Sequence, residues 1–375
     1  MRILFAGGGT GGHVYPAIAT IDEIRRRYPK AKIGYVGTRR GLEAEILSTR
    51  GDVRFFPIHV RGLPRGRPLG TLRTLAFLGL AFVETIVVLA RFRPWVVVGV
   101  GGHSSFPPVF LAACIGQILP IRTMIHEQNV IGGLTNRLLA RFVDVVMVSF
   151  AESRASFPRA RRLVVTGNPI REEMLHVKRT DDAYRLFGLD PKRRTILVFG
   201  GSRGSHEITE QIRLGKNRIA ADRGLQILLI TGDEERTRAL RSEMRAAGAH
   251  NVVVKTYIER MGHAFAVADL VVCRAGATSL AEITACGKAS LLVPWRGATD
   301  DHQWENAHLF RAEGACAVAD RDVIVRGGLV RMMQELAGDD AQLHRIAGNA
   351  RRSGRLDARA AIMGEIGTLV RGAHA

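Results

Sequence analysis

Short runs of apolar residues recur along the chain, and each is followed by a stretch whose apolar positions have helical spacing. The runs span residues 3–6, 32–36, 95–100, 195–199, 226–230, 270–273 and 290–293, and several end directly before a glycine. Continuous Val, Ile and Leu runs of this kind are typical of parallel strands that are buried on both faces. The alternation therefore predicts an α/β protein with doubly wound parallel sheets.

The alternation starts twice, which indicates two similar halves. In each half the first strand runs directly into a glycine loop. Between the halves, a Gly-Asn-Pro turn within residues 166–171 interrupts the pattern, because such turns end regular structure. We therefore expect one domain at 1–166 and a second at 167–344. The Ala- and Arg-rich tail has helical spacing, and we expect a helix at about 345–375 that packs back on the first domain.

One segment, residues 75–90, is apolar apart from Glu84 and Thr85. As a helix it would extend about 24 Å, against roughly 30 Å of hydrocarbon, so we expect no transmembrane span. The first interpretation is a helix largely buried against a sheet. The second is a patch resting on anionic lipid, because Glu84 is the one acidic residue among flanking arginines. These are Arg61, Arg65, Arg67, Arg73, Arg91 and Arg93.

The composition is that of an ordinary folded protein. The chain has 375 residues, of which 46% are hydrophobic and 24% charged, and this excludes a disordered or fibrous chain. At ~150 residues per domain, the length favours two to three domains. Neither a disulfide framework nor a metal site is indicated, because the cysteines lack C-x-x-C spacing and zinc-finger histidines. They are Cys114, Cys273, Cys286 and Cys316.

The charge balance indicates an anionic partner. The chain has 54 Lys and Arg residues against 35 Asp and Glu residues, which gives a formal net charge of +19. Nucleic acid, an anionic membrane and phosphorylated substrates would all suit this charge. The chain shows no RNP, zinc-finger or basic-helix motif, so we do not expect nucleic acid as the partner. The N-terminus lacks the apolar core of a secretory signal, and we expect a cytoplasmic protein.

The first glycine loop, residues 7–13, follows a strand and opens a helix. Glycines there let backbone N–H groups approach a phosphate, and the helix N-terminus favours negative charge. The loop contains G-x-G-x-x-G, but the second strand ends without the acidic residue that binds a ribose. Arg39 and Arg40 could instead accept the 2′-phosphate of NADP, so an NADP-dependent oxidoreductase remains an alternative.

Two further glycine loops, residues 101–105 and 200–205, also follow apolar strands. A tight turn that needs positive φ explains any one of them equally well. Three such loops in one chain favour a diphosphate held between the two halves.

Three polar clusters accompany these loops. Residues 126–129 (His-Glu-Gln-Asn) follow a short apolar run, and Glu282 lies one to two turns into the helix after residues 270–273. A carboxylate there can accept both hydroxyls of a ribose or support the helix dipole. Residues 300–307 could be mistaken for a metal site, but helix capping or sugar contact is at least as consistent with two acids and one histidine, Asp300, Asp301 and His302, at a helix start.

Six ordered blocks resemble the MurG family, the peptidoglycan glycosyltransferases that add N-acetylglucosamine to a lipid-linked muramoyl-pentapeptide. The resemblance runs from about residue 1 to beyond Ala307. It implies a GT-B fold, with two Rossmann-like domains facing across a cleft. The blocks are 8–13, 126–129 with 133–136, 167–171, 200–202, 274–277 with Glu282, and 301–303 with 306–307.

The resemblance implies UDP-N-acetylglucosamine as donor and undecaprenyl-diphospho-muramoyl-pentapeptide (lipid I) as acceptor. It implies contact with the anionic cytoplasmic face of the cell membrane, as a peripheral protein, and with other cell-wall synthesis proteins. The implied donor contacts are Ser202 at the diphosphate, Arg171 at the nucleotide, the Ile258 backbone at the uracil, Glu282 at the ribose, Gln303 and Asn129 at the sugar, and the helix start Ala277, Thr278, Ser279, Leu280 and Ala281. Thr10, Gly11 and Gly12 would face the acceptor diphosphate.

The implied reaction is an inverting displacement without a cofactor or catalytic metal. His13 is the leading candidate for the base that takes the proton of the muramoyl 4-hydroxyl, because a neutral imidazole suits this task at neutral pH. Glu127 is the alternative candidate for the base. His103, in the second glycine loop, is a second imidazole that could share this role. Another UDP-sugar transferase of the same fold and a non-enzymatic polyanion-binding protein remain alternatives.

Overall fold

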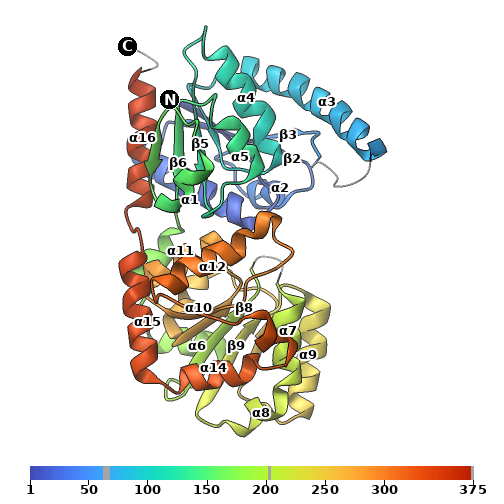
Figure 1. Ribbon diagram of the computed structural model, residues 1–375, viewed down its shortest axis with the longest axis vertical. Helices are drawn as coiled ribbons and strands as arrows, with labels where there is room; N and C mark the ends of the chain where they lie inside the picture. Colours follow the sequence, from blue (N-terminus) through green and yellow to red (C-terminus); the bar gives the residue numbers. More distant parts are fainter. Residues whose placement is uncertain (62–67, 202–203, 373–375) are drawn as a thin grey trace. The chain divides into compact units, whose positions relative to one another are not determined.

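The computed structural model describes residues 1–61, 68–201 and 204–372. The chain divides into two compact units, Met1–Arg171 with Asp357–Ala375, and Glu172–Leu356 (Figure 1). The division falls after Arg171, whereas the sequence places it after residue 166. The tail also divides, because helix α15 (Asp340–Ser353) belongs to the second unit and α16 (Ala358–Gly372) to the first.

The first unit is built on a sheet of seven parallel strands in the order β3-β2-β1-β4-β5-β6-β7. The strands are β1 (Arg2–Ala6), β2 (Lys32–Thr38), β3 (Arg54–Ile58), β4 (Val96–Gly99), β5 (Arg122–Glu127), β6 (Val145–Val148) and β7 (Leu163–Val165). The helices, besides α16, are α1 (Gly11–Arg27), α2 (Leu42–Ser48), α3 (Pro68–Phe92), η1 (His103–Ser105), α4 (Phe106–Ile115), α5 (Leu134–Leu139) and η2 (Ala151–Ser156).

Alternate residues of the strands face opposite layers of helices. In β1, Ile3 and Phe5 belong to a core shared with α1, α2 and α16, whereas Leu4 and Ala6 belong to a core shared with α3, α4 and α5. Side chains on neighbouring strand positions point to opposite faces, so a continuous apolar run fills both cores. The sheet is therefore doubly wound, as the sequence predicts (Figure 1).

The second unit has six parallel strands in the order β10-β9-β8-β11-β12-β13. The strands are β8 (Arg194–Phe199), β9 (Leu225–Ile230), β10 (Val252–Lys255), β11 (Leu270–Cys273), β12 (Ala289–Leu292) and β13 (Ala317–Val318). The helices, besides α15, are η3 (Glu172–His176), α6 (Asp181–Phe187), α7 (His206–Leu214), α8 (Lys216–Ala221), α9 (Glu234–Ala246), α10 (Met261–Val267), α11 (Ala277–Cys286), η4 (Thr299–Asp301), α12 (His302–Ala312), α13 (Arg321–Val325) and α14 (Leu329–Ala337).

Helix α3 differs from the first interpretation of its sequence. It extends over 25 residues, or about 37 Å. Within it, Thr74–Phe92 is long and apolar enough to cross a membrane by length and composition, and only 28% of its most apolar window is buried. The expectation of a short helix largely buried against the sheet is therefore wrong. Its exposed large apolar side chains are Leu75, Leu80, Val83, Ile86 and Val87.

The basic flank of α3 is described in part. The guanidinium of Arg61 lies 4.7 Å from the centre of the Phe77 ring. Glu84, the acidic residue of the helix, accepts a hydrogen bond from the His59 backbone N–H at 2.7 Å. Arg65 and Arg67 lie outside the described residues, and so does the side chain of Arg73.

Candidate functional site

The first two glycine loops pack against each other where the strand order of the first sheet reverses. β1 and β4 are neighbours in the sheet. From β1 the strand order continues through β2 to the edge strand β3, and from β4 it continues in the opposite direction to the edge strand β7. Ligands of open α/β sheets bind at such a point, outside the carboxyl ends of the strands. The Gly8 N–H donates to the Gly101 carbonyl at 3.3 Å, and a Cβ on Gly102 (φ 79°) would lie 2.4 Å from the Gly8 oxygen. Glycine is therefore required for this contact.

A buried carboxylate that sequence reasoning did not single out supports the first loop. Glu43, near the start of α2, is fully buried. One of its oxygens accepts the Gly9 N–H at 3.1 Å, and the other accepts the Thr38 N–H at 2.8 Å and the Thr38 hydroxyl at 2.7 Å. A Cβ on Gly8 would lie only 2.3 Å from the carboxyl carbon. The one sequence signal was a glutamate that closely follows Gly37 and Gly41, and both glycines approach its side chain closely.

The loop is therefore unlike a dinucleotide-binding loop. The N–H of Gly9 is used by Glu43, and a carboxylate lies directly beneath the glycines. The N–H groups that a helix leaves without partners are those of its first turn. At α1 this turn begins at Gly11, after the exposed Thr10, and it contains no acidic residue. Thr10, Gly11 and Gly12 therefore lie at a helix start whose first turn carries no negative charge.

His13 points from the first turn of α1 toward the loop that follows β5. Its Nδ1 lies 2.9 Å from Oε1 of Gln128. The imidazole also packs against the second glycine loop, because a Cβ on Gly101 (φ 94°) would lie 3.0 Å from its Cε1. His13 is partly exposed. His103 lies within the second glycine loop and begins η1.

Glu127, the rival base, is buried at the end of β5 and holds the polar loop after it. Its Oε1 accepts from the backbone and side-chain nitrogens of Asn129 at 3.0 and 3.2 Å. Its Oε2 accepts from the Gly133 N–H and from the Asn136 side chain, both at 2.9 Å. A carboxylate has about four acceptor positions, and four donors occupy them here. This arrangement positions Asn129 and suits a structural carboxylate better than a base.

The third glycine loop follows β8 in the second unit, at the carboxyl end of that strand. Ser202 and Arg203 lie outside the described residues. A Cβ on Gly204 (φ 69°) would lie 1.7 Å from the Thr231 carbonyl oxygen, so only glycine fits there. Ser205 then caps α7, since its hydroxyl accepts the Ile208 N–H at 3.2 Å. The loop therefore leads into a helix N-terminus, as an anion-binding loop would.

The start of α11 lies at the carboxyl end of β11. Ala277 and Leu280 are buried, and the Leu280 N–H donates to the Gly276 carbonyl at 3.0 Å, while Thr278, Ser279 and Ala281 are partly exposed. Glu282 is 5% exposed. Arg274, just before this helix, donates to the Val293 carbonyl at 3.1 Å and pairs with Glu207 of α7 at 2.8 Å. Arg274 thus ties the ends of three elements together.

The other residues that the sequence predicts to contact the donor substrate lie on two further segments of the second unit and in the first unit. Gln303 opens α12, and its Oε1 accepts the Trp295 N–H at 3.0 Å. Ile258 follows β10, and its side chain is buried. Both lie on the side of the second sheet where the strands have their carboxyl ends, as does the helix that carries Glu282. Arg171 lies in the first unit, with its guanidinium 5.5 Å from the centre of the Tyr15 ring.

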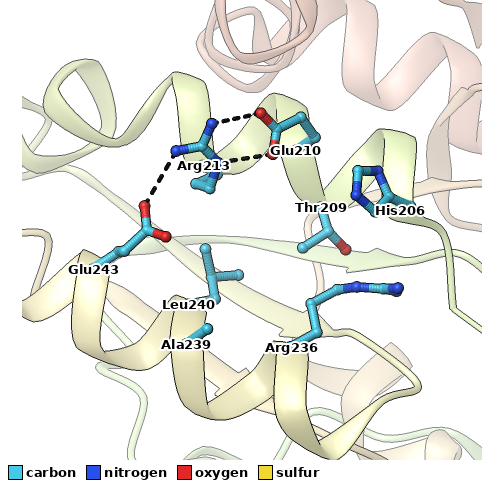
Figure 2. A pocket seen from close by; sticks show the side chains of 8 residues that line it. All are labelled: His206, Thr209, Glu210, Arg213, Arg236, Ala239, Leu240 and Glu243. Atoms are coloured by element: carbon cyan, nitrogen blue, oxygen red, sulfur yellow. Dashed lines mark hydrogen bonds and ion pairs between the residues drawn. The ribbon is translucent and has the colours of Figure 1, made fainter.

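Among the described residues, no group of three or more His, Cys, Asp or Glu side chains could hold a metal ion. A small pocket between α7 and α9 is lined by charged side chains (Figure 2). There Arg213 is neutralised, because it pairs with Glu210 at 2.6 Å and with Glu243 at 3.3 Å.

Comparison with known proteins assigns both halves to one family. Residues 3–148 match the glycosyltransferase family 28 N-terminal domain, and residues 195–360 match the C-terminal domain of that family. These matches leave no support for the NADP-dependent oxidoreductase that the first loop left open.

Individual relatives match over nearly the whole chain. A UDP-N-acetylglucosamine–N-acetylmuramyl-(pentapeptide) pyrophosphoryl-undecaprenol N-acetylglucosamine transferase of Caldanaerobacter subterraneus is 39% identical, covering 96% of this chain and 97% of the relative. A transferase of the same name from Lactiplantibacillus plantarum is 36% identical, covering 99% and 100%. The crystal structure of Acinetobacter baumannii MurG superposes with a TM-score of 0.73 at 25% identity, covering 98% and 99%. The chain therefore has the GT-B fold and belongs to the MurG family of glycosyltransferases.

Proposed function

We propose that the protein transfers N-acetylglucosamine from UDP-N-acetylglucosamine to the muramoyl 4-hydroxyl of lipid I, which yields lipid II for peptidoglycan synthesis. The observation that carries this proposal is the identity of 36–39% to transferases named for this reaction, over 96–99% of the chain. The site at the reversal of the first sheet supports it, since it combines a helix start that has no acidic residue in its first turn with an imidazole.

In this reaction His13 is the base. The acceptor oxygen forms a bond to the anomeric carbon of the donor sugar while the bond from that carbon to the diphosphate oxygen breaks. The hydroxyl proton passes to the imidazole, and the electron pair of the broken bond leaves with UDP. An α-linked donor then gives a β-linked product. Neutral imidazole is suited to this step at neutral pH, and the partly exposed position of His13 supports the assignment.

Each unit supplies most of the contacts to one substrate, and Asn129 and Arg171 of the first unit also contact the donor. Thr10, Gly11 and Gly12 bind the acceptor diphosphate through the start of α1, which has no competing acidic residue in its first turn. The second unit binds UDP-N-acetylglucosamine at the loop that contains Ser202 and at the start of α11, where Glu282 accepts the ribose hydroxyls. Gln303 and Asn129 contact the sugar, and Arg171 and Ile258 contact the nucleotide.

The protein works at the cytoplasmic face of the cell membrane as a peripheral protein. The lipid anchor of the acceptor requires the first unit to reach a membrane surface. Helix α3 offers a row of exposed apolar side chains, and the chain has a net charge of +19. Apolar contact together with attraction to anionic headgroups is how peripheral helices bind membranes.

A transfer assay tests the reaction. The wild-type protein is given radiolabelled UDP-N-acetylglucosamine or labelled UDP-N-acetylgalactosamine, with a soluble lipid I analogue as acceptor. We expect transfer from the first donor alone and a product that is a β-linked disaccharide. If the protein binds the donor but does not transfer to the lipid I analogue, the acceptor assignment is wrong, and the protein is a GT-B transferase of another pathway. If the protein does not bind the donor, the whole proposal is overturned.

A further inference from the structure

A continuous series of hydrogen bonds leads from the buried residues behind the first glycine loop to the imidazole of His13. It begins at the Gly167 carbonyl, passes through His126 and Gln128, and reaches Nδ1 of His13. His126 and Gln128 are 2% and 1% exposed, so water does not compete for the bond between these two side chains. The reaction as proposed uses His13 but assigns no task to the two residues behind it.

The Gly167 carbonyl fixes the proton of His126. It lies 2.9 Å from Nε2 of the ring, and a carbonyl oxygen only accepts, so Nε2 carries the proton. Burial lowers the pKa of His126 to about 4, and the ring is therefore neutral at physiological pH. A neutral imidazole has a single N–H, which leaves Nδ1 of His126 as an acceptor.

The orientation of the Gln128 amide follows from three acceptors. Its Nε2 lies 3.1 Å from the Val100 carbonyl, 3.0 Å from the His126 carbonyl and 3.1 Å from Nδ1 of His126. Turning the amide over would place its oxygen against three acceptors in a buried site, which is costly. The amide nitrogen therefore faces these groups, and Oε1 faces His13.

We infer that Gln128 is a positioning residue that, together with His126, holds His13 in the tautomer with its proton on Nδ1. The amide oxygen can only accept, so the His13 nitrogen 2.9 Å away must donate. Nε2 of His13 is then unprotonated and is the atom that receives the acceptor proton. This inference rests on the proposed role of His13 as base.

The choice of glutamine has a chemical consequence. A carboxylate in this position would also orient the imidazole, but its charge would stabilise the protonated ring. The neutral amide fixes the tautomer without adding that charge. His13 can thus hold its proton on the correct side and still release the second proton after each transfer.

Nitrogen NMR tests the inference directly. The protein is labelled with ¹⁵N-histidine, and the His13 signals are assigned as those missing from the His13→Ala spectrum. The spectrum is recorded about two pH units above the reference imidazole pKa of ~6.5. We expect Nδ1 to show the shift of a protonated nitrogen and Nε2 that of an unprotonated one. The opposite pattern, or an even mixture, overturns the inference.

Gln128→Met removes the amide at nearly equal volume. We expect its His13 signals to move toward the Nε2–H form and kcat to fall by about 100-fold, at the lower end of what general-base catalysis contributes. The Kd for UDP should stay unchanged, because the Gln128 side chain is buried behind His13 and is not among the residues proposed to contact UDP. Unchanged His13 shifts in a folded Gln128→Met variant would overturn the inference.

Gln226→Met is the matched control. Gln226 is also a buried glutamine, and its amide bonds Asp190 and Thr195 in the second unit. It should lower stability without changing the His13 tautomer. If Gln128→Met does not fold, the wild-type spectrum still decides, since it reports the proton position itself. The measurement needs no substrate, so an inactive transfer assay is distinguishable from failure of this inference.

Discussion

The carboxylate of Glu43 accepts the backbone N–H of Gly9 at 3.1 Å from a fully buried position. The same carboxylate anchors Thr38 at the end of β2. It therefore joins the first glycine loop to the neighbouring strand and fixes the start of α1, where His13 lies.

Glu43→Gln is expected to loosen this loop. The variant keeps the volume but places an NH₂ group against either the Gly9 or the Thr38 donors. Hydrogen bonds to charged groups contribute about 1.5–3 kcal/mol, so the free energy of unfolding should fall by a similar amount. Urea denaturation measures this change, and the KM for the acceptor should rise. Glu45→Gln, an exposed neighbour on α2, is the control and should do neither.

Glu282→Gln is expected to weaken donor binding. If Glu282 accepts the ribose hydroxyls, loss of its charge should raise the Kd for UDP by about 10- to 100-fold, from ~1.5–3 kcal/mol per charged hydrogen bond. Titration calorimetry with UDP and with 2′,3′-dideoxy-UDP measures this. The variant and the wild type should bind the dideoxy compound equally well. If the two proteins still differ in their Kd for the dideoxy compound, Glu282 does not act through the ribose hydroxyls.

Acid should destabilise the protein through His126. Its pKa is lowered by burial to about 4, while the unfolded chain binds the proton near a pKa of ~6.5. Between these values the unfolded state holds more protons, so stability rises with pH in this window and is lost as pH falls through it. Urea denaturation near neutral pH and at pH ~5 should show a smaller loss of stability in His126→Gln than in wild type. Equal losses in both would contradict this source of acid sensitivity.

Charges on the exposed face of α3 should prevent membrane binding. Val83 and Ile86 are 59% and 51% exposed, and a glutamate at either position would have to enter the headgroup region and would repel anionic lipid. Flotation with vesicles of phosphatidylglycerol and phosphatidylethanolamine should recover wild type but not Val83→Glu or Ile86→Glu. Val325→Glu is the control, since Val325 is 72% exposed on the second unit. Equal flotation of all four proteins would refute the membrane role of α3.

Most central strands of both sheets could be predicted from the sequence. They are apolar on both faces, and β1, β4 and β8 run into the three glycine loops. The pattern missed β3, β7, β10 and β13, which are the four edge strands of the two sheets. Edge strands are short or partly polar, so they lack a continuous apolar run. It also missed β6, which is buried and apolar but is followed by Ser149 rather than glycine.

The candidate site was predictable only where motifs mark it. The glycine loops and the imidazole of His13 stand in recognisable order along the chain. Glu43 and Gln128 act through hydrogen bonds to residues 34 and 115 positions away, and no local pattern reports such contacts. The exposed face of α3 was misjudged for a similar reason, because apolar composition does not show which side a neighbouring layer covers.

The identity of the base tests the account most directly. Single-turnover transfer to a lipid I analogue should be measured at saturating UDP-N-acetylglucosamine for wild type, His13→Ala and His103→Ala, with the Kd for UDP determined separately. We predict that His13→Ala lowers the rate by at least ~100-fold with an unchanged Kd, because a general base contributes about 10²–10⁴-fold. His103→Ala should retain most of the rate. A His13→Ala rate within about threefold of wild type would contradict the account, since a base contributes far more.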